Sequence, residues 1–188
     1  MNFSESDLEL TILSKLQDKG YEYGNTTDSW FEDRELNEFI NKDLLFERLK
    51  TINPKSKNSW INDAITSILR ISSTTLFERN RIFHDYLTNG IRIETGNDES
   101  NPTIKLIDFE NVENNTFQVV NQIKFNEKGQ TRIPDILVYI NGLPLIIFEL
   151  KSTEYRENTF LINAWKQLGG KGDNDGYRYD IPTLFDYN

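Results

Sequence analysis

The sequence predicts a mixed domain of the α/β (α+β) class, in which helices cover both faces of a mixed sheet. Helical periodicity dominates the first half, strand patterns follow from about residue 91, and a helical pattern returns after residue 158. The strongest strand pattern is a hairpin that is apolar on both faces and must be covered on both. We expect one domain over residues 1–188, with a helical half at about 1–90 and a sheet core at about 91–168.

In the first half, apolar residues recur at helical spacing in four segments: 8–19, 35–50, 59–71 and 75–88. Ser6 or Asp7 is placed to cap the first helix, and Gly20 is placed to end it. Residues 21–30 are polar and predict a loop.

The second half predicts short strands before the hairpin, at 91–94, 103–108 and 116–125. After the hairpin, the periodicity of residues 159–168 predicts a helix. Residues 169–176 are rich in Gly and Asp and predict a loop, and 181–187 form a closing segment.

The hairpin itself consists of residues 133–140 and 145–150, which are rich in β-branched and aromatic side chains. Asn141 and Gly142 lie between these two runs and give the strongest short-range hairpin signal. Because apolar residues occupy both faces of each run, we expect the hairpin to be central in the sheet.

Three charged residues flank the hairpin at one end, Asp135 on the first strand and Glu149 and Lys151 on the second. Glu149 and Lys151 are two residues apart and share a face. A strict two-residue turn would pair Asp135 with Phe148 and turn its side chain away from Glu149. Since Pro144 cannot donate a ladder hydrogen bond, we predict a three-residue loop or a bulge, which would bring Asp135 back to the face of Glu149.

Two carboxylates at a strand end can hold Mg²⁺, which prefers carboxylate, water and phosphate oxygens. A nearby lysine can stabilise developing negative charge or help to orient a water. Together these groups are the minimum set for metal-assisted phosphodiester hydrolysis. The spacing alone does not separate this site from a solvated strand end. Glu9 likewise fits either a first-turn acid favoured by the helix dipole or part of a site.

Composition excludes several classes of function. The chain has no cysteine, and its single histidine, His84, is expected on a helix as a partly buried or surface residue. The net charge of −9 argues against a free-standing, tight nucleic-acid binder. No phosphate-binding loop that ends in Gly-Lys-Ser/Thr is present, so we expect no ATP site in this segment. No apolar run approaches a membrane span and the start lacks a signal peptide, so we expect a cytoplasmic protein without membrane contact.

The motif Asn-Gly-Leu-Pro at 141–144, followed by Glu-Leu-Lys at 149–151, is highly specific to one group of proteins. With it, the second half resembles the N-terminal nuclease domain of the restriction (R) subunit of type I restriction–modification enzymes. The other matching stretches are 106–109, 115–122, 132–135, 164–167, 181–188 and, near the N-terminus, Leu8-Glu9 with Gly20-Tyr21. Residues from about 22 to 76 match poorly.

The resemblance implies a PD-(D/E)xK restriction-endonuclease-like fold, a mixed sheet flanked by helices. Asp135 and Glu149 would then be the Mg²⁺ ligands, and Lys151 would assist the attacking water. Glu9 would complete the surroundings of the metal, and Gln167 would lie near the site or the DNA.

The family usually carries a tyrosine about four residues after this glutamine. The position is Lys171 here, within the Gly/Asp-rich segment, and Tyr177 or Tyr179 could take that role.

The resemblance also implies partners. Members of the family continue into an ATP-dependent DNA translocase and then into a helical part that docks on the methyltransferase (M) subunit, while the specificity (S) subunit recognises the sequence. We therefore expect residues 1–188 to be a fragment of a longer chain, with ATP bound only by the full-length enzyme and duplex DNA delivered by the motor.

Two other functions remain open at this point. The first is a non-catalytic module of the same fold that couples a motor to partner subunits. The second is a stand-alone repair or junction nuclease.

Overall fold

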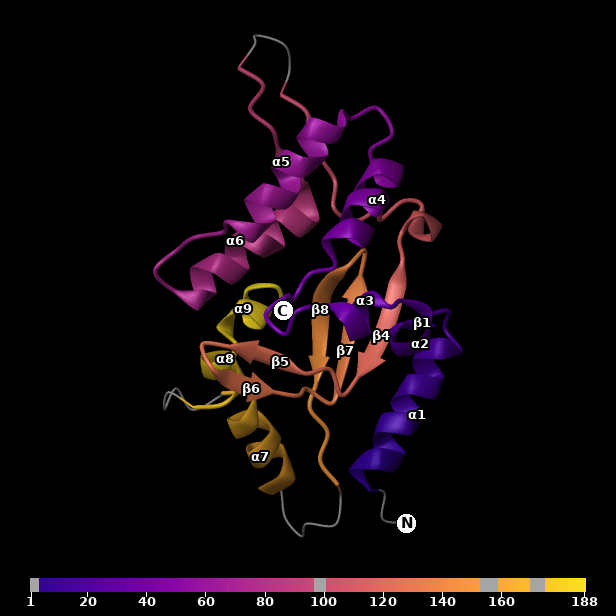
Figure 1. Cartoon of the computed structure of the whole chain (residues 1–188), viewed down its shortest axis with the longest axis vertical. Coiled ribbons are helices and arrows are strands. Elements are labelled where there is room, and N and C mark those ends of the chain that lie inside the picture. Colours follow the sequence, from indigo (N-terminus) through magenta and orange to yellow (C-terminus); the bar gives the residue numbers. More distant parts are fainter. Residues whose placement is uncertain (1–3, 97–100, 153–158, 170–174) are drawn as a thin grey trace.

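The computed structural model describes residues 4–96, 101–152, 159–169 and 175–188 (Figure 1). The helices in these ranges are α1 (Glu5–Gln17), α2 (Gly24–Thr27), α3 (Trp30–Asp33), α4 (Lys42–Ile52), α5 (Asn58–Leu69), α6 (Leu76–Asn89), α7 (Thr159–Gln167), α8 (Tyr177–Asp180), α9 (Pro182–Asp186) and the 3₁₀ turn η1 (Val112–Asn114). The strands are β1 (Glu22–Tyr23), β2 (Ile91–Arg92), β3 (Thr103–Ile104), β4 (Phe117–Asn121), β5 (Phe125–Glu127), β6 (Gln130–Arg132), β7 (Ile136–Ile140) and β8 (Leu143–Phe148).

The central sheet has four strands in the order β1-β4-β7-β8 (Figure 1). β1 pairs parallel with β4, while the β4–β7 and β7–β8 pairs are antiparallel, which confirms the predicted mixed sheet. β1 lies within the predicted loop at 21–30, and that expectation is wrong because pairing with β4 gives this polar segment a strand structure. β2–β3 and β5–β6 form two smaller antiparallel pairs.

The β7–β8 hairpin has the irregularity that the sequence predicts. Its register runs from Ile140 opposite Leu143 at the turn to Ile136 opposite Phe148 at the far end, with a shift between Val138 and Tyr139. Leu145 is the extra residue on β8. The shift therefore places the positions beyond Ile136 and Phe148, which are Asp135 and Glu149, opposite one another.

The α1 helix begins earlier than the sequence indicates. Ser4 is the N-cap, not Ser6 or Asp7, and its side chain accepts a hydrogen bond from the Asp7 N–H. The Asp7 carboxylate in turn accepts from the Ser4 N–H at 3.1 Å, which completes a capping box. The bounds of α5, α6 and α7 lie within one residue of the predicted starts and two of the predicted ends.

The predicted helix at 35–50 is wrong in its first part, because α4 begins only at Lys42. The buried Arg34 guanidinium donates to the carbonyls of Glu35 and Glu38, which fixes this segment in an irregular course. Phe39 then stacks on Phe125 with ring centroids 4.8 Å apart. Tertiary contacts therefore override the helical spacing of these apolar residues.

Four predicted strands are shorter than expected: the strand at 91–94 ends at Arg92, the hairpin strand at 133–140 begins only at Ile136, and two others are cut short by local turns. The strand at 103–108 ends at Ile104, since Asp108 accepts local backbone hydrogen bonds in a turn. The strand at 116–125 is interrupted after Asn121, where Gln122 adopts a left-handed φ of 52°.

The sheet separates two hydrophobic clusters. On one face, Leu13 of α1 packs with Val119, Ile136 and Val138. The larger cluster on the other face includes Leu137 and Tyr139 of β7 together with residues of the helices α3 to α6, α8 and α9. β7 is thus covered on both faces, as its sequence predicts, but the expectation of a central hairpin is wrong for β8, which forms an edge of the sheet and leaves Ile146 exposed. Figure 1 shows α1 beside the sheet and α5 and α6 beyond its upper end.

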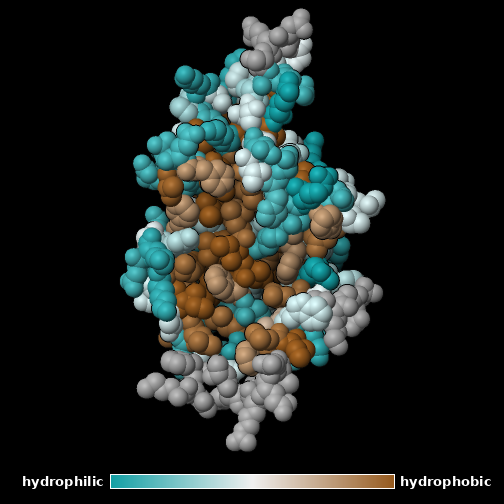
Figure 2. All heavy atoms as spheres, turned by 180° about the vertical axis from the view of Figure 1, so that it is seen from behind, coloured by the Kyte–Doolittle hydropathy of each residue, from teal (hydrophilic) through white to brown (hydrophobic). Residues whose placement is uncertain are grey.

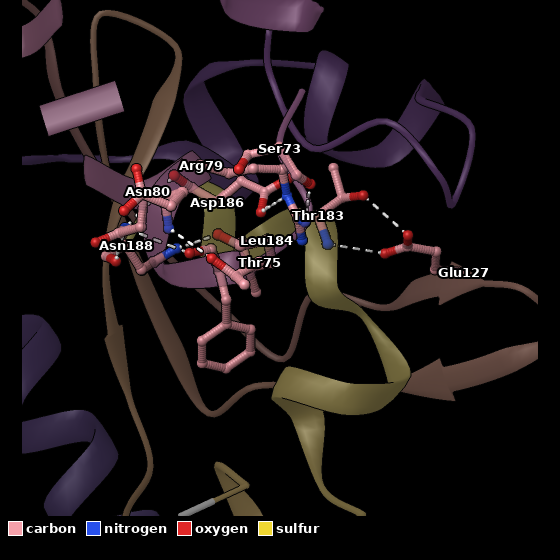
Figure 3. A network of polar contacts seen from close by, with 11 residues as sticks. Ser73, Thr75, Arg79, Asn80, Glu127, Thr183, Leu184, Asp186 and Asn188 are labelled. Atoms are coloured by element: carbon pink, nitrogen blue, oxygen red, sulfur yellow. Dashed lines mark hydrogen bonds and ion pairs between the residues drawn. The ribbon is translucent and has the colours of Figure 1, made fainter. Parts of the chain in front are cut away.

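The C-terminal helix α9 is held by a polar network (Figure 3). The Arg79 Nε of α6 lies 2.7 Å from Asp186 Oδ1, and the Asn80 amide donates to the Asn188 carbonyl at 2.5 Å. On the opposite side, the Glu127 carboxylate accepts from the Thr183 N–H and hydroxyl. These contacts join α9 to both α6 and β5.

Seen from behind, apolar residues gather across the middle of the molecule (Figure 2). Ile146 of the edge strand β8 is among the exposed apolar residues and has 45% of its surface accessible. Among the helices that the structure describes, none is long and apolar enough to cross a bilayer.

Candidate active site

Asp135 and Glu149 meet at the end of the hairpin that lies opposite the Asn141-Gly142 turn. They directly flank the Ile136–Phe148 pair, and side-chain alternation places both on the face of Leu137 and Ile147. Asp135 Oδ2 accepts a hydrogen bond from the Leu150 N–H at 2.6 Å, which ties the two strand ends together. The structure therefore brings together the two carboxylates that the sequence singles out.

Lys151 joins them, as its spacing predicts. Its Nζ lies 2.5 Å from Glu149 Oε1 and 2.9 Å from the Leu150 carbonyl oxygen. The Glu149 side chain is almost fully buried, with 1% exposed, and that of Lys151 is 19% exposed. The ammonium thus compensates one oxygen of a carboxylate that is withdrawn from water.

The electrostatics of the pair favour a cation. Burial raises the pKa of Asp135, against the opposing effects of the Leu150 N–H and Lys151. Burial also raises the pKa of Glu149, and the nearby charge of Asp135 adds to this rise despite the contact with Lys151. Two carboxylates that share a poorly solvated site repel each other, so a bound cation would stabilise their ionised forms.

Glu9 reaches the same end of the sheet from α1. Its Oε1 accepts from the Asn121 side-chain amide, and its Oε2 accepts from the Gln122 amide at 3.0 Å. The charge of Glu9 contributes to the raised pKa of Asp135. Glu9 lies one turn beyond the first turn of α1, so the helix dipole does not account for its position.

Gln167 is connected to the site by hydrogen bonds that pass through the Tyr177 hydroxyl. Its Nε2 donates to the Tyr177 hydroxyl at 2.8 Å, and that hydroxyl donates to the Ile133 carbonyl at 3.1 Å, two residues before Asp135. Of the two tyrosines considered from the sequence, Tyr177 makes this contact, whereas Tyr179 is 57% exposed. Lys171 lies outside the described residues.

The donor set can be compared with the needs of Mg²⁺. No group of three or more His, Cys, Asp or Glu side chains able to hold a metal occurs in the described ranges. Mg²⁺ is commonly held by one or two carboxylates and completes its shell with water and substrate oxygens, so two ligands suffice. Glu149 Oε2 is buried and finds no hydrogen-bond partner within the part of the chain that the structure describes. An orphaned carboxylate oxygen next to a second carboxylate fits a hard divalent cation.

Sequence reasoning missed one neighbour of the site, Glu5. Glu5, in the first turn of α1, accepts from the Ser152 N–H at 3.2 Å, and its charge raises the pKa of both Asp135 and Glu149. Its spacing of four residues from Glu9 could have indicated that the two share a helix face. The sequence offered Tyr177 and Tyr179 as alternatives near Gln167, and the structure selects Tyr177.

The structure is therefore that of a mixed α/β domain with two carboxylates and a lysine at one end of its β7–β8 hairpin. The sequence matches the family described as the type I restriction enzyme R protein N terminus (HSDR_N) over residues 2–188, and the chain belongs to this family.

Curated relatives agree with this assignment. The HindI type I restriction enzyme endonuclease subunit of Haemophilus influenzae is 34% identical over 98% of this chain and 18% of its own length. A candidate type I restriction enzyme endonuclease subunit of Methanocaldococcus jannaschii, MjaIXP, is 30% identical over 96% of this chain and 17% of its own length. The chain therefore spans less than a fifth of the length of both relatives.

Proposed function

We propose that this chain is the nuclease domain of a type I restriction enzyme R subunit, with the PD-(D/E)xK fold, and that it hydrolyses phosphodiester bonds of duplex DNA with Mg²⁺. The observation that carries the proposal is the irregular β7–β8 register, which places Asp135 opposite Glu149 with Lys151 beside them. Membership of the R-protein family supports the assignment of substrate and reaction.

Each residue of the site has a distinct role in the proposed reaction. Asp135 and the free Oε2 of Glu149 would hold Mg²⁺, which when bound supplies Lewis-acid polarisation of the scissile phosphate and lowers the pKa of a water. The Lys151 ammonium, fixed by Glu149 and the Leu150 carbonyl, orients the attacking water and stabilises negative charge at the phosphate. Glu9 adds negative charge that favours a cation, and Gln167 supports the Asp135 segment through Tyr177.

The longer protein would supply what this domain lacks. The lengths of the relatives leave room for an ATP-dependent translocase that delivers duplex DNA, and the methyltransferase and specificity subunits would act with that longer chain. The acidity of the domain is consistent with delivery by another part of the enzyme, since a net charge of −9 weakens unaided DNA binding.

Titration calorimetry with Mn²⁺ tests the metal site. Asp135→Asn and Glu149→Gln should each weaken Mn²⁺ binding about tenfold or more, since each removes an anionic ligand. Asp63→Asn is the matched control, because Asp63 is an exposed residue of α5 and the substitution makes the same charge change. If both site variants bind Mn²⁺ as tightly as the control does, the metal role is wrong.

Plasmid nicking in Mg²⁺ or Mn²⁺ tests the chemistry. Lys151→Ala should keep Mn²⁺ binding and lose about 100-fold in nicking rate, the scale on which one charge-stabilising donor acts. In the full-length enzyme, the same variant should lose cleavage while ATP-driven translocation continues. Cleavage that persists at the wild-type rate would instead favour a non-catalytic coupling module.

A further inference from the structure

A groove of about 410 Å³ lies next to the acidic pair. Its walls come from the β6–β7 connection, the end of α7 and the start of α8, with Arg132, Lys166, Gln167, Asp175 and Tyr177 among the lining residues. Tyr177 separates the groove from the acidic pair. Its hydroxyl contacts the Gln167 amide and the Ile133 carbonyl, and the charges of Glu149 and Asp135 contribute to raising its pKa. A ligand in the groove would therefore continue into the proposed metal centre.

Two basic side chains among the described lining residues, Lys166 and Arg132, take no part in the proposed catalytic step. Lys166 is exposed, and no ion pair is found for it among the described residues. The Arg132 Nε and Nη2 both contact Asp180 Oδ2, at 2.7 and 2.5 Å, and Asp180 is buried behind it. Arg132 Nη1 donates to the Thr131 carbonyl at 3.3 Å, which leaves further N–H groups of a guanidinium that is 34% exposed.

Negative charge in the groove is limited. Asp175 is the one carboxylate among the lining residues that the structure describes, and its Oδ1 accepts from the Gly176 N–H at 2.7 Å. Asp180 neutralises Arg132 in part but also holds its guanidinium in one orientation. Cations thus line the groove in a chain in which acidic residues outnumber basic ones by 30 to 21.

We propose that this groove binds backbone phosphates of the duplex that enters the Asp135–Glu149 centre, with Lys166 and Arg132 as the phosphate contacts. The inference rests on the proposed nuclease function and adds where the substrate lies. Phosphates recur along each strand, so a groove that holds one next to the centre fixes which phosphodiester reaches the acids. The contacts are made to the backbone and carry no base specificity.

Duplex binding by the 188-residue chain tests the groove without metal or cleavage. Fluorescence anisotropy with a labelled 20-base-pair duplex is measured at low salt in EDTA. Lys166→Glu should weaken binding about tenfold, and it should lower the slope of log Kd against log salt by about one. Lys55→Glu makes the same charge change in the exposed turn between α4 and α5, at the other end of the molecule from α7 (Figure 1), and should change Kd less than twofold.

A second variant has the opposite sign. Asp175→Asn keeps an oxygen for the Gly176 N–H and removes the carboxylate charge from the groove, so it should tighten binding about two- to threefold. Asp63→Asn, with the same charge change far from the groove, should not. Circular dichroism confirms that all variants fold.

The outcomes separate this proposal from the nuclease assignment. Lys166→Glu that binds like Lys55→Glu, or a wild-type chain that does not bind the duplex at low salt, overturns the groove and leaves the Mn²⁺ and nicking results untouched. Weakened binding by Lys166→Glu together with Mn²⁺ binding that ignores Asp135 and Glu149 upholds the groove and overturns the metal centre.

Discussion

Asp108 shows how one side chain can organise a loop. Its Oδ1 accepts from the backbone N–H groups of Glu110 and Asn111, and its Oδ2 accepts from the Asn114 side chain at 2.8 Å. Asn115 bonds both to the Asp108 backbone and, through Oδ1, to the side-chain amide of Asn141 at the hairpin turn. The loop and the hairpin turn are thus joined by a chain of buried polar contacts.

Acidification should expose the contribution of Asp108. The Asn111 N–H and the Asn114 amide hold its pKa below the ordinary value, so its ionised form stabilises the fold above that value. This stabilisation should be lost as pH falls through the folded-state pKa. Urea unfolding of Asp108→Asn should therefore show a deficit in the free energy of unfolding at pH 7 that shrinks towards pH 3. Asp63→Asn should show no such dependence, and a constant deficit for Asp108→Asn would contradict the assignment.

At the scale of elements, the hairpin turn rests against the start of α4. The Asn41 N–H donates to the Gly142 carbonyl at 3.0 Å, and the Tyr139 hydroxyl donates to the Phe39 carbonyl at 3.1 Å. Gly142 has a φ of 82°, and a Cβ there would lie 2.5 Å from the Asn41 carbonyl oxygen. Both the backbone conformation and the close approach require glycine.

Gly142→Ala should therefore lower the free energy of unfolding by about 2–4 kcal/mol, from left-handed strain together with a backbone clash. Gly129 provides the matched control, since its φ is 80° but a Cβ there would meet nothing within 4 Å. Gly129→Ala should cost only about 1 kcal/mol. Chemical denaturation measures both, and equal losses would show that strain alone acts at Gly142.

Counting residues along the two strands of the hairpin explains why the positions of the main site residues could be predicted from sequence. The positions of Asp135, Glu149 and Lys151 follow from side-chain alternation and from one irregular residue near Pro144, all within a short local segment. The sequence could not choose between Tyr177 and Tyr179, because the contact with Gln167 depends on how the chain returns across an intervening loop. The helical pattern at 35–40 misled for the same reason, since the contacts of Arg34 and Phe39 are made with residues far along the chain.

At the scale of the whole molecule, the C-terminal helix is joined to the middle of the chain. α9 packs on α6 through the Arg79–Asp186 pair, whose side chains are 21% and 13% exposed (Figure 3). Burial raises the pKa of Asp186, and Arg79 opposes this rise. A cleft of about 400 Å³ runs beside this pair, and none of the proposed site residues lines it. We therefore interpret the network as structural.

Arg79→Ala should lower the free energy of unfolding by about 1–3 kcal/mol, because it leaves a largely buried carboxylate without its partner. Asp186→Asn in the Arg79→Ala background should recover part of the loss by removing that charge. Arg81→Ala on the same helix removes an exposed pair with Glu78 and should cost less than about 0.5 kcal/mol. Thermal or urea unfolding distinguishes the variants, and equal effects at Arg79 and Arg81 would show that the network contributes little.

The additional residue at Leu145 has a consequence for protein engineering. A designer who idealised this hairpin at constant length, with Leu145 paired opposite Val138, would obtain a regular ladder without the bulge. That ladder would pair Asp135 with Phe148, so Glu149 and Lys151 would project to the opposite layer from Asp135, whereas deleting Leu145 would leave Asp135 opposite Glu149. Such a redesign would separate the two proposed metal ligands, and a score based on foldability alone would rate it an improvement.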